Sequence, residues 1–271
     1  MTDSKYSSYS YLDVTVKDGI AVIVINRPEK MNACGRPEHT ELSTILRVIQ
    51  DDDDVRVAVI TGAGKAFSVG GDLDFLDEMH ADTRLTVDVL KEAREIVQAH
   101  IAFEKPIVCA INGVAMGAGL AFALLCDYII VERHAQLADG HIRAALASGD
   151  GGALVWPLTV GLTKAKRYLM TGDSIGAEEA ERLGLVSEVV DQGRSLDRAM
   201  FVARRFAAGP QLAIRYTKMA LNQWLRQGQL TAFDYSYALE QLTFADDEVA
   251  TAVKGLRERR ESAIPPDSAD W

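Results

Sequence analysis

The chain has 271 residues, of which 48% are hydrophobic and 25% charged, with 29 Lys and Arg against 39 Asp and Glu. This composition is typical of a folded globular protein and argues against a membrane-spanning or disordered chain. The net charge of −10 has the wrong sign for clamping phosphate backbones, so it disfavours nucleic-acid binding.

The three cysteines, Cys34, Cys109 and Cys126, show no CxxC spacing, so they predict neither a disulfide framework nor a zinc site. Residues 1–10 are polar, lack the apolar stretch of a signal peptide and are predicted to form a flexible leader. Residues 107–131 are apolar enough to suggest a membrane span, but glycines and polar residues interrupt them. We therefore expect a cytoplasmic protein with no membrane partner.

The chain is predicted to open with a β-hairpin. Residues 11–16 and 20–26 are apolar or alternating, and they flank the turn dipeptide Asp18-Gly19. A helix beginning at Pro37 then carries apolar residues at helical spacing. The acidic run 51–54 ends this helix and is expected to be a solvated corner.

Strand, turn and helix then recur. Residues 55–61 form an apolar strand that leads into the glycine-rich segment 62–72, and a long amphipathic helix follows over residues 83–103. The apolar stretch 107–131 is interpreted as a buried strand, a glycine-rich turn, a short helix and a second strand. The last predicted elements of this part are a helix over 177–182 and a strand over 185–190.

From about residue 195 the strand pattern vanishes, and four helical stretches follow, broken near Gly209-Pro210, Gly228 and Asp246-Asp247. The earlier strand-turn-helix units could stack as an irregular spiral, and a doubly wound sheet is the structural alternative. The sequence therefore predicts an α/β core over residues 11–194 and a helical region over residues 195–271.

Two glycine-rich turns stand where predicted buried strands end. GAGKAFSVGGD follows strand 55–61, and NGVAMGAG follows strand 107–111. Glycine lets backbone N–H groups approach a ligand closely, and a helix N-terminus adds positive charge. Two such turns could converge on one oxygen as an oxyanion hole, although close packing alone is the alternative.

Several short segments carry a family resemblance that covers nearly the whole chain. In order they are NRPEKMNA (26–33), GAGKAFSVGGDL (62–73), KPIVCAING (105–113), Cys126-Asp127, LMTG (169–172), 177–180, Gly184-Leu185-Val186 and the final helix over 246–260. Together they resemble the crotonase superfamily, the enoyl-CoA hydratase and isomerase family. The resemblance implies a spiral of ββα units and a C-terminal helical region that packs subunits into a homotrimer or a dimer of trimers.

The same resemblance implies an acyl-CoA substrate, with coenzyme A as part of the substrate and no tightly bound cofactor. The amides that hold the thioester oxygen in this family fall on Gly71 and Ala118, and each such donor is worth about 3 kcal/mol. The substrate-binding positions that the resemblance implies are Ala66, Phe67, Val69, Gly71, Asp72, Leu73, Gly117 and Ala118.

The chain departs from the hydratases at both catalytic glutamates, whose positions fall on Ala121 and His141. His141 is followed by Asp150 in a glycine-flanked turn, and an Asp-oriented imidazole is a competent acid or base near neutral pH. One branch of the superfamily, the β-diketone hydrolases that include 6-oxocamphor hydrolase, is similar here. It implies further candidates at His39 and Glu240, and a matching Trp156-Pro157 pair.

Each of these candidates has a structural alternative. Asp139 is a second possible partner for His141, and Asp150 could instead cap the helix that starts near Gly151. His39 extends the apolar face of its helix as a core histidine would, and Glu240 fits an exposed helix face. The histidine and cysteine spacings predict no metal site.

Three functions remain in view. The leading one is an enzyme of the enoyl-CoA hydratase/isomerase family that binds an acyl-CoA thioester at Gly71 and Ala118 and uses His141 and Asp150 as acid and base. The alternative is hydrolysis of a carbon–carbon bond in a β-dicarbonyl compound. A third is a non-catalytic or RNA-associated member that keeps only the scaffold.

Overall fold

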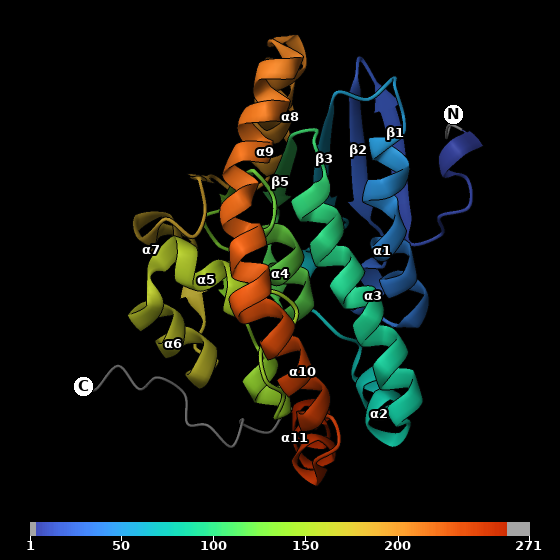
Figure 1. The fold of residues 1–271 in the computed structure, drawn as a ribbon, viewed down its shortest axis with the longest axis vertical. Helices are drawn as coiled ribbons and strands as arrows, with labels where there is room; N and C mark the ends of the chain where they lie inside the picture. Colours follow the sequence, from blue (N-terminus) through green and yellow to red (C-terminus); the bar gives the residue numbers. More distant parts are fainter. Residues whose placement is uncertain (1–3, 259–271) are drawn as a thin grey trace.

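A computed structural model describes residues 4–258, which form two β-sheets surrounded by helices (Figure 1). The larger sheet is parallel except for its first hairpin. Its strands lie in the order β1 (Leu12–Lys17), β2 (Ile20–Ile25), β3 (Val57–Gly62), β5 (Ile107–Ile111), β7 (Tyr128–Glu132) and β10 (Glu188–Val190).

The central strands of this sheet are covered on both faces, which explains their continuous apolar sequences. Ala58 and Ile60 of β3 face the core that contains α1 (Arg36–Gln50) and α3 (Thr83–Ala102). Val57 and Val59 alternate with them and face α8 (Ser195–Ala208) on the opposite side. In Figure 1, α1 and α3 lie side by side in front of β1–β3.

The smaller sheet is formed mainly by short strands that follow the central strands of the larger sheet along the chain. Its strands are β4 (Ala66–Ser68), β6 (Val114–Met116), β8 (Gln136–Ala138) and β9 (Ile175–Gly176), in that order. Each of β3, β5 and β7 therefore leads into a short strand of this second sheet before the next helix or turn. This stacked spiral confirms the predicted crotonase-like fold over the doubly wound alternative.

The remaining helices lie around and beyond the sheets. They are α2 (Leu73–Ala81), α4 (Gly117–Leu124), α5 (Gly152–Val160), α6 (Leu162–Thr171), α7 (Ala177–Leu183), α9 (Gln211–Gly228), α10 (Asp234–Thr243) and α11 (Asp247–Arg257), with short 3-10 helices η1 (Ser4–Tyr6), η2 (Pro28–Lys30) and η3 (His141–Ala144). At the lower end of Figure 1, α11 packs against α2, and α10 leads down to α11.

Two predicted boundaries are wrong. The chain does not break at Gly228, because a π-helical segment η4 (Gln229–Phe233) joins α9 to α10 and Gly228 itself has helical dihedral angles. The strand predicted over 185–190 is confined to β10, since Leu185 and Val186 belong to the main core before the strand starts. In addition, α2 was not predicted, although Asp72 caps it in the usual way.

The predictions of a flexible leader over residues 1–10 and of a solvated corner over residues 51–54 also need correction, because these two segments contact each other. Tyr6 is only 1% exposed, and its hydroxyl donates a hydrogen bond to the buried Asp52 carboxylate. Lys5 pairs with the same carboxylate. The leader is therefore anchored from Lys5 onward, and Asp52 within the acidic run is a buried anchor for it. Residues 1–3 lie outside the described part of the chain.

Within residues 4–258, none of the helices combines the length and apolar character that a membrane crossing requires. The apolar stretch 107–131 forms β5, α4 and most of β7, as its interpretation predicted, but the predicted turn between β5 and α4 contains the short strand β6.

Candidate active site

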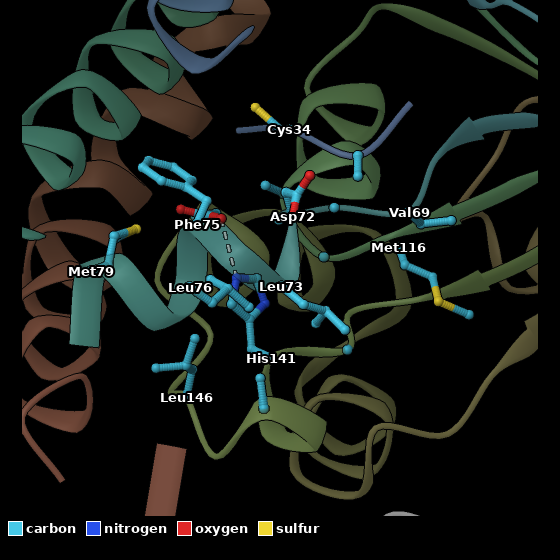
Figure 2. Close-up of a pocket in the computed structure, with 18 of the residues that line it drawn as sticks. Cys34, Val69, Asp72, Leu73, Phe75, Leu76, Met79, Met116, His141 and Leu146 are labelled. Carbon is cyan, nitrogen blue, oxygen red and sulfur yellow. Dashed lines mark hydrogen bonds and ion pairs between the residues drawn. The ribbon is translucent and has the colours of Figure 1, made fainter. Parts of the chain in front are cut away.

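A cavity of about 650 Å³ lies between the glycine-rich turns and the helices α2, α3, α10 and α11. Figure 2 shows Phe75, Leu76, Met79 and Leu146 grouped on one side of it, with Val69 and Met116 on the other. The wall is therefore mostly apolar, with a few polar groups that converge on it. Such a composition is typical of sites for small molecules.

The first glycine-rich turn is held in place by Asn32, which is fully buried. Its side-chain amide donates hydrogen bonds to the carbonyls of Ala63, Ala66 and Phe67. Because Asn32 has a left-handed backbone (φ 58°), the chain turns sharply here and brings Cys34 beside the glycines. The parallel bridge between Cys34 and Gly71 uses the Gly70 carbonyl and the Asp72 amide. The Gly71 amide takes no part in this pairing.

The second turn lies directly against the first. A Cβ atom at Gly70 would lie 2.9 Å from the Met116 carbonyl oxygen, so only glycine allows this approach. Ala118 is the second residue of α4, and its amide is one of those that lack an intrahelical acceptor. Gly71 and Ala118 both line the cavity, so the structure brings the two predicted oxyanion residues into one wall.

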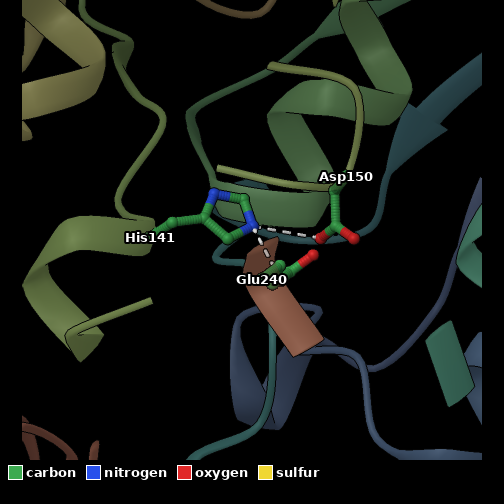
Figure 3. A group of neighbouring side chains, drawn as sticks. All are labelled: His141, Asp150 and Glu240. Carbon is green, nitrogen blue, oxygen red and sulfur yellow. Dashed lines mark hydrogen bonds and ion pairs between the residues drawn. The ribbon is translucent and has the colours of Figure 1, made fainter. Parts of the chain in front are cut away.

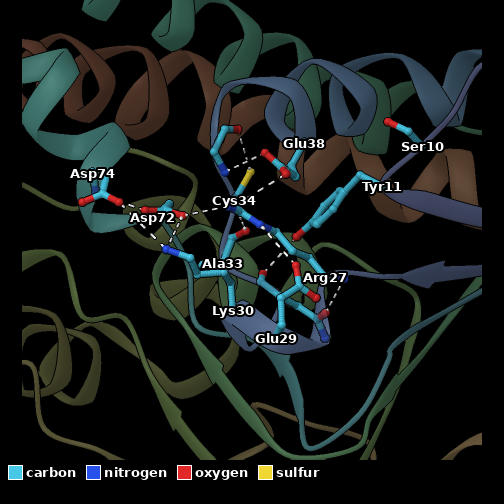
Figure 4. A network of polar contacts seen from close by, with 12 residues as sticks. Ser10, Tyr11, Arg27, Glu29, Lys30, Ala33, Cys34, Glu38, Asp72 and Asp74 are labelled. Atoms are coloured by element: carbon cyan, nitrogen blue, oxygen red, sulfur yellow. Dashed lines mark hydrogen bonds and ion pairs between the residues drawn. The ribbon is translucent and has the colours of Figure 1, made fainter.

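A network of charged side chains borders the same wall (Figure 4). Arg27 and Lys30 approach the Asp72 carboxylate at 3.1 and 3.9 Å, and Arg27 also approaches Glu38 at 3.5 Å. Asp72 in turn accepts the Asp74 amide and caps α2. The network therefore fixes the segment before α1 to the start of α2, beside Gly71.

A buried polar cluster lines the same cavity. His141 Nδ1 lies 2.8 Å from Asp139. His141 Nε2 lies 3.2 Å from Asp150 and 3.7 Å from Glu240, as Figure 3 shows. The Asp139 carboxylate also accepts a hydrogen bond from Ser148. Small residues make room for this cluster, because a Cβ atom at Gly152 would clash with Ser148 and Asp139.

The neighbours of His141 set the charge of the cluster. Burial opposes protonation of the imidazole, but Asp139 and Asp150 outweigh it and raise the pKa of His141 well above its ordinary value. Burial alone would raise the pKa of Asp150, yet its hydrogen bond to His141 and the charge of that ring lower it overall. Burial and the nearby Asp150 charge raise the pKa of Glu240 well above its ordinary value.

The structure excludes the helix-cap alternative for Asp150 and the exposed-face alternative for Glu240. Asp150 does not cap α5, whose N-cap is Gly151 without a side-chain hydrogen bond, and it pairs with His141 instead. Glu240 is buried rather than on an exposed helix face, because α10 turns it toward His141. Asp139, the second candidate, makes the shorter contact with the imidazole.

His39 is both buried and adjacent to the cavity. Its Nδ1 lies 2.9 Å from Glu92 on α3, so it is a satisfied histidine that also lines the site. Of the predicted binding residues, Val69, Gly71, Asp72, Leu73, Gly117 and Ala118 line the cavity. Ala66 and Phe67 do not line it, because both are residues of β4 whose side chains are buried in the protein. Ala121 is likewise buried in α4.

Sequence reasoning missed the apolar wall contributed by α2 and α11. Phe75 and Met79 lie one helical turn apart on α2, and Leu256 reaches the cavity from α11. The Asp72 cap followed by apolar residues at this spacing was the available sign of α2. No local pattern places α11 beside it, because their contact joins distant parts of the chain.

The fold therefore places two glycine-rich turns and a cluster of titratable side chains, His141, Asp150 and Glu240, at one cavity. The enoyl-CoA hydratase/isomerase family model matches residues 15–264. The chain belongs to this family, and it is a crotonase-family enzyme.

Individual relatives agree in length and fold. A crotonyl-CoA hydratase from Syntrophomonas wolfei is 31% identical over 94% of this chain and 98% of its own length. A solved enoyl-CoA hydratase/isomerase from Mycobacterium paratuberculosis is 36% identical with a TM-score of 0.87, covering 90% of this chain and 97% of that one. A β-diketone hydrolase from the cyanobacterium Anabaena, bound to (S)-3-oxocyclohexyl acetic acid, is 28% identical with a TM-score of 0.83, covering 90% and 98%.

Proposed function

We propose that this enzyme adds water to the double bond of an enoyl-CoA thioester, with the thioester oxygen bound by the Gly71 and Ala118 amides. The cluster of His141 and Asp150 supplies the proton chemistry. The observation that carries this proposal is that both glycine-rich turns and the buried cluster line one cavity. The crotonyl-CoA hydratase relative supports the same substrate class.

The two amides stabilise the charge that develops on the thioester oxygen. When water attacks the β-carbon, electrons move toward the carbonyl and form an enolate. Two fixed donors in a mostly apolar cavity stabilise this enolate more than water does. No metal or tightly bound cofactor is part of the proposal, which rests on main-chain donors and titratable side chains alone.

Replacing Ala118 with proline tests the oxyanion role, because proline lacks the N–H and is tolerated in the first turn of a helix. We expect Ala118→Pro to lower kcat for crotonyl-CoA hydration by about 100-fold or more. Ala118→Gly keeps the N–H and serves as the matched control, with a rate within a few-fold of the unmodified enzyme. Equal rates for Ala118→Pro and Ala118→Gly would show that this amide does not act on the substrate.

A second candidate function is the hydrolysis of a carbon–carbon bond in a β-diketone. The similar Anabaena hydrolase and the replacement of both hydratase glutamates by Ala121 and His141 favour it. The assay that separates the two compares crotonyl-CoA with a panel of cyclic 1,3-diketones in the absence of coenzyme A. If the enzyme cleaves a diketone and does not hydrate crotonyl-CoA, the hydration proposal is wrong and β-diketone hydrolysis takes its place.

We also propose that the chain assembles as a homotrimer or as a dimer of trimers through its C-terminal helices. Helix α9 is 18 residues long, yet it buries only Lys218 and Asn222 within the chain. Large apolar side chains on α9, η4 and α10 are more than 60% exposed, and these outer apolar residues are Leu212, Tyr216, Leu221, Trp224, Leu230, Tyr235 and Leu242. Such a surface is typical of an interface between subunits. A cytoplasmic location stays a prediction from cysteine usage.

A further inference from the structure

The imidazole of His141 has a carboxylate at each ring nitrogen. Asp139 is 2.8 Å from Nδ1, and Asp150 is 3.2 Å from Nε2. An ionised carboxylate only accepts hydrogen bonds, so both ring nitrogens must donate, and a ring that donates from both nitrogens is an imidazolium. An imidazolium has no lone pair with which to accept a proton or to bind a metal ion. The proton acceptor of the cluster is therefore a different group.

Glu240 is the third carboxyl group on this ring, and it has no other charged partner among the described residues. Its Oε1 lies 3.7 Å from His141 Nε2, and the side chain is only 4% exposed. Its Oε2 is buried without a hydrogen-bond partner. Gly149 makes this position possible, because a Cβ atom there would clash with Oε2. The closest oxygens of Glu240 and Asp150 lie within 4.8 Å of each other.

The balance of charge decides which carboxyl group holds a proton. One imidazolium cannot neutralise the carboxylates of Asp139, Asp150 and Glu240 together, and an unpaired buried charge is costly. Asp139 and Asp150 have the hydrogen bonds to the ring, so Glu240 is the group that becomes neutral. The pKa shifts agree in direction, because Glu240 is raised and Asp150 is lowered.

The other titratable groups around the pair do not reverse this balance. His39 on α1 acts electrostatically on Asp150 but is paired with Glu92 on α3. The Cys34 thiol is buried, and burial raises its pKa well above its ordinary value, so it stays neutral. On α10 itself, the neighbouring phenol is Tyr237, whose pKa is also raised by burial.

We propose that Asp150 and Glu240 are the acid–base pair of this site, with Asp150 as the ionised acceptor, Glu240 as the protonated donor and His141 as the imidazolium that positions both. This inference rests on the function proposed above. It restores two carboxyl groups to a chain whose family glutamate positions hold Ala121 and His141. When two carboxyl groups lie in different environments, their pKa values move apart, so one can act as an acid and the other as a base.

The proton balance of the hydration step then closes. Asp150 takes a proton from the water whose oxygen bonds to the β-carbon, and the double-bond electrons move into the thioester enolate at Gly71 and Ala118. The enolate collapses as its α-carbon takes the proton of Glu240. Asp150 ends protonated and Glu240 ionised, so one proton passes from the former to the latter to reset the site. The sum is one water added across one double bond.

The protonation states are tested without any substrate, by infrared difference spectroscopy of the protein at neutral pH. We expect the carbonyl band of a protonated buried carboxyl group, lost in Glu240→Gln. The matched control is Glu132→Gln, because Glu132 is also buried but accepts hydrogen bonds from Ser195, away from the cavity. The band must persist in that control. A spectrum without this band, or a metal ion retained through Glu240, overturns the proposal.

The roles are tested by crotonyl-CoA hydration across pH. We expect Glu240→Gln and Asp150→Asn each to lower kcat by about 100-fold or more, with KM changed only a few-fold. Loss of activity at high pH reports Glu240 and disappears in Glu240→Gln, whereas loss at low pH reports Asp150. His141→Gln removes the positive charge, so it should move the low-pH limb upward. A merely structural role for His141 would leave both limbs in place.

The outcomes separate the inference from the proposed function. If crotonyl-CoA is not hydrated but the Glu240 band is present, the reaction is wrong and the paired protonation states stand. If crotonyl-CoA is hydrated and Glu240→Gln keeps the full rate and pH profile, the reaction stands and the acid–base pair is overturned. In the first case Glu132→Gln should keep the carboxyl band, and in the second case it should retain the activity and pH profile of the unmodified enzyme.

Discussion

Two buried histidines show how neighbours, and not burial alone, decide whether an imidazole is charged. His141 has carboxylates at both ring nitrogens, and they raise its pKa well above the ordinary value. His100 on α3 has the Ile96 carbonyl at Nδ1, a buried Nε2 without a hydrogen-bond partner, and the Phe122 ring at 4.5 Å. Burial lowers the pKa of His100 to about 4. The same residue type is therefore a buried cation in one place and a neutral core residue in the other.

This contrast predicts how His100 affects stability at different pH values. Above its ordinary pKa of 6.5, His100 is neutral in both the folded and unfolded chains, so its contribution is fully present. As pH falls from 6.5 toward 4, the unfolded chain takes up a proton that the folded chain refuses, and the free energy of unfolding decreases. Between pH 7.5 and pH 5 this loss amounts to about 2 kcal/mol.

Urea unfolding at the two pH values measures the effect. We expect His100→Leu to reduce the pH dependence of the unfolding free energy by that amount. Phe122→Leu removes the ring contact but keeps His100, so it should retain the original pH dependence. If His100→Leu keeps the original pH dependence of the unfolding free energy, groups other than His100 cause the loss of stability at low pH.

At the scale of elements, glycines let strands and turns approach more closely than any side chain allows. Gly62 ends β3 where the chain turns back as β4, and a Cβ atom there would clash with the carbonyl oxygens of Ala66 and Phe67. These same carbonyls accept the hydrogen bonds of Asn32. A side chain at position 62 would therefore push apart the turn that leads to Gly71.

We predict that Gly62→Ala lowers the free energy of unfolding by at least about 2 kcal/mol, because the clash is with backbone atoms that are already packed. Gly255→Ala is the matched control. Gly255 lies within α11 with no atom within 4 Å of a new Cβ, so alanine should stabilise the helix by about 0.5–1 kcal/mol. Urea unfolding of both variants measures the difference, and a neutral Gly62→Ala would contradict the close approach.

At the scale of the whole molecule, one end of the spiral is closed by elements from distant parts of the chain. Arg257 on α11 pairs with Asp74 and Asp77 on α2, and α10 brings Glu240 to His141. The exposed surfaces of α9, η4 and α10 carry the outer apolar residues. The C-terminal region therefore both completes the site and presents a surface suited to another copy of the chain.

We predict that Trp224→Glu, at one of these outer apolar residues, weakens self-association by about 30-fold or more. A charge would enter an apolar interface, where large aromatic side chains contribute most of the binding energy. Sedimentation velocity over a range of concentrations measures it. Phe201→Glu is the control, since Phe201 is an exposed aromatic residue on α8 and not one of the outer apolar residues. A monomeric unmodified protein at all concentrations would contradict the assembly.

Hydrophobic periodicity and turn residues alone determined the hairpin, the buried strands, the helical C-terminal region and the two glycine-rich turns, because these depend on local spacing. The resemblance added the family and the pairing of Gly71 with Ala118. Local spacing failed at Gly228, where a buried Leu154 side chain packs against the glycine and the helix continues.

Only the tertiary structure decided which groups surround His141. Asp139 and Asp150 are near it in sequence, but Glu240 arrives from a helix a hundred residues away, so no spacing rule could assign its neighbours or its charge. The sequence determines which groups can exchange protons, since residue type sets the chemistry. The fold decides which of them do so, because proton affinity depends on burial and on charges that only folding brings together.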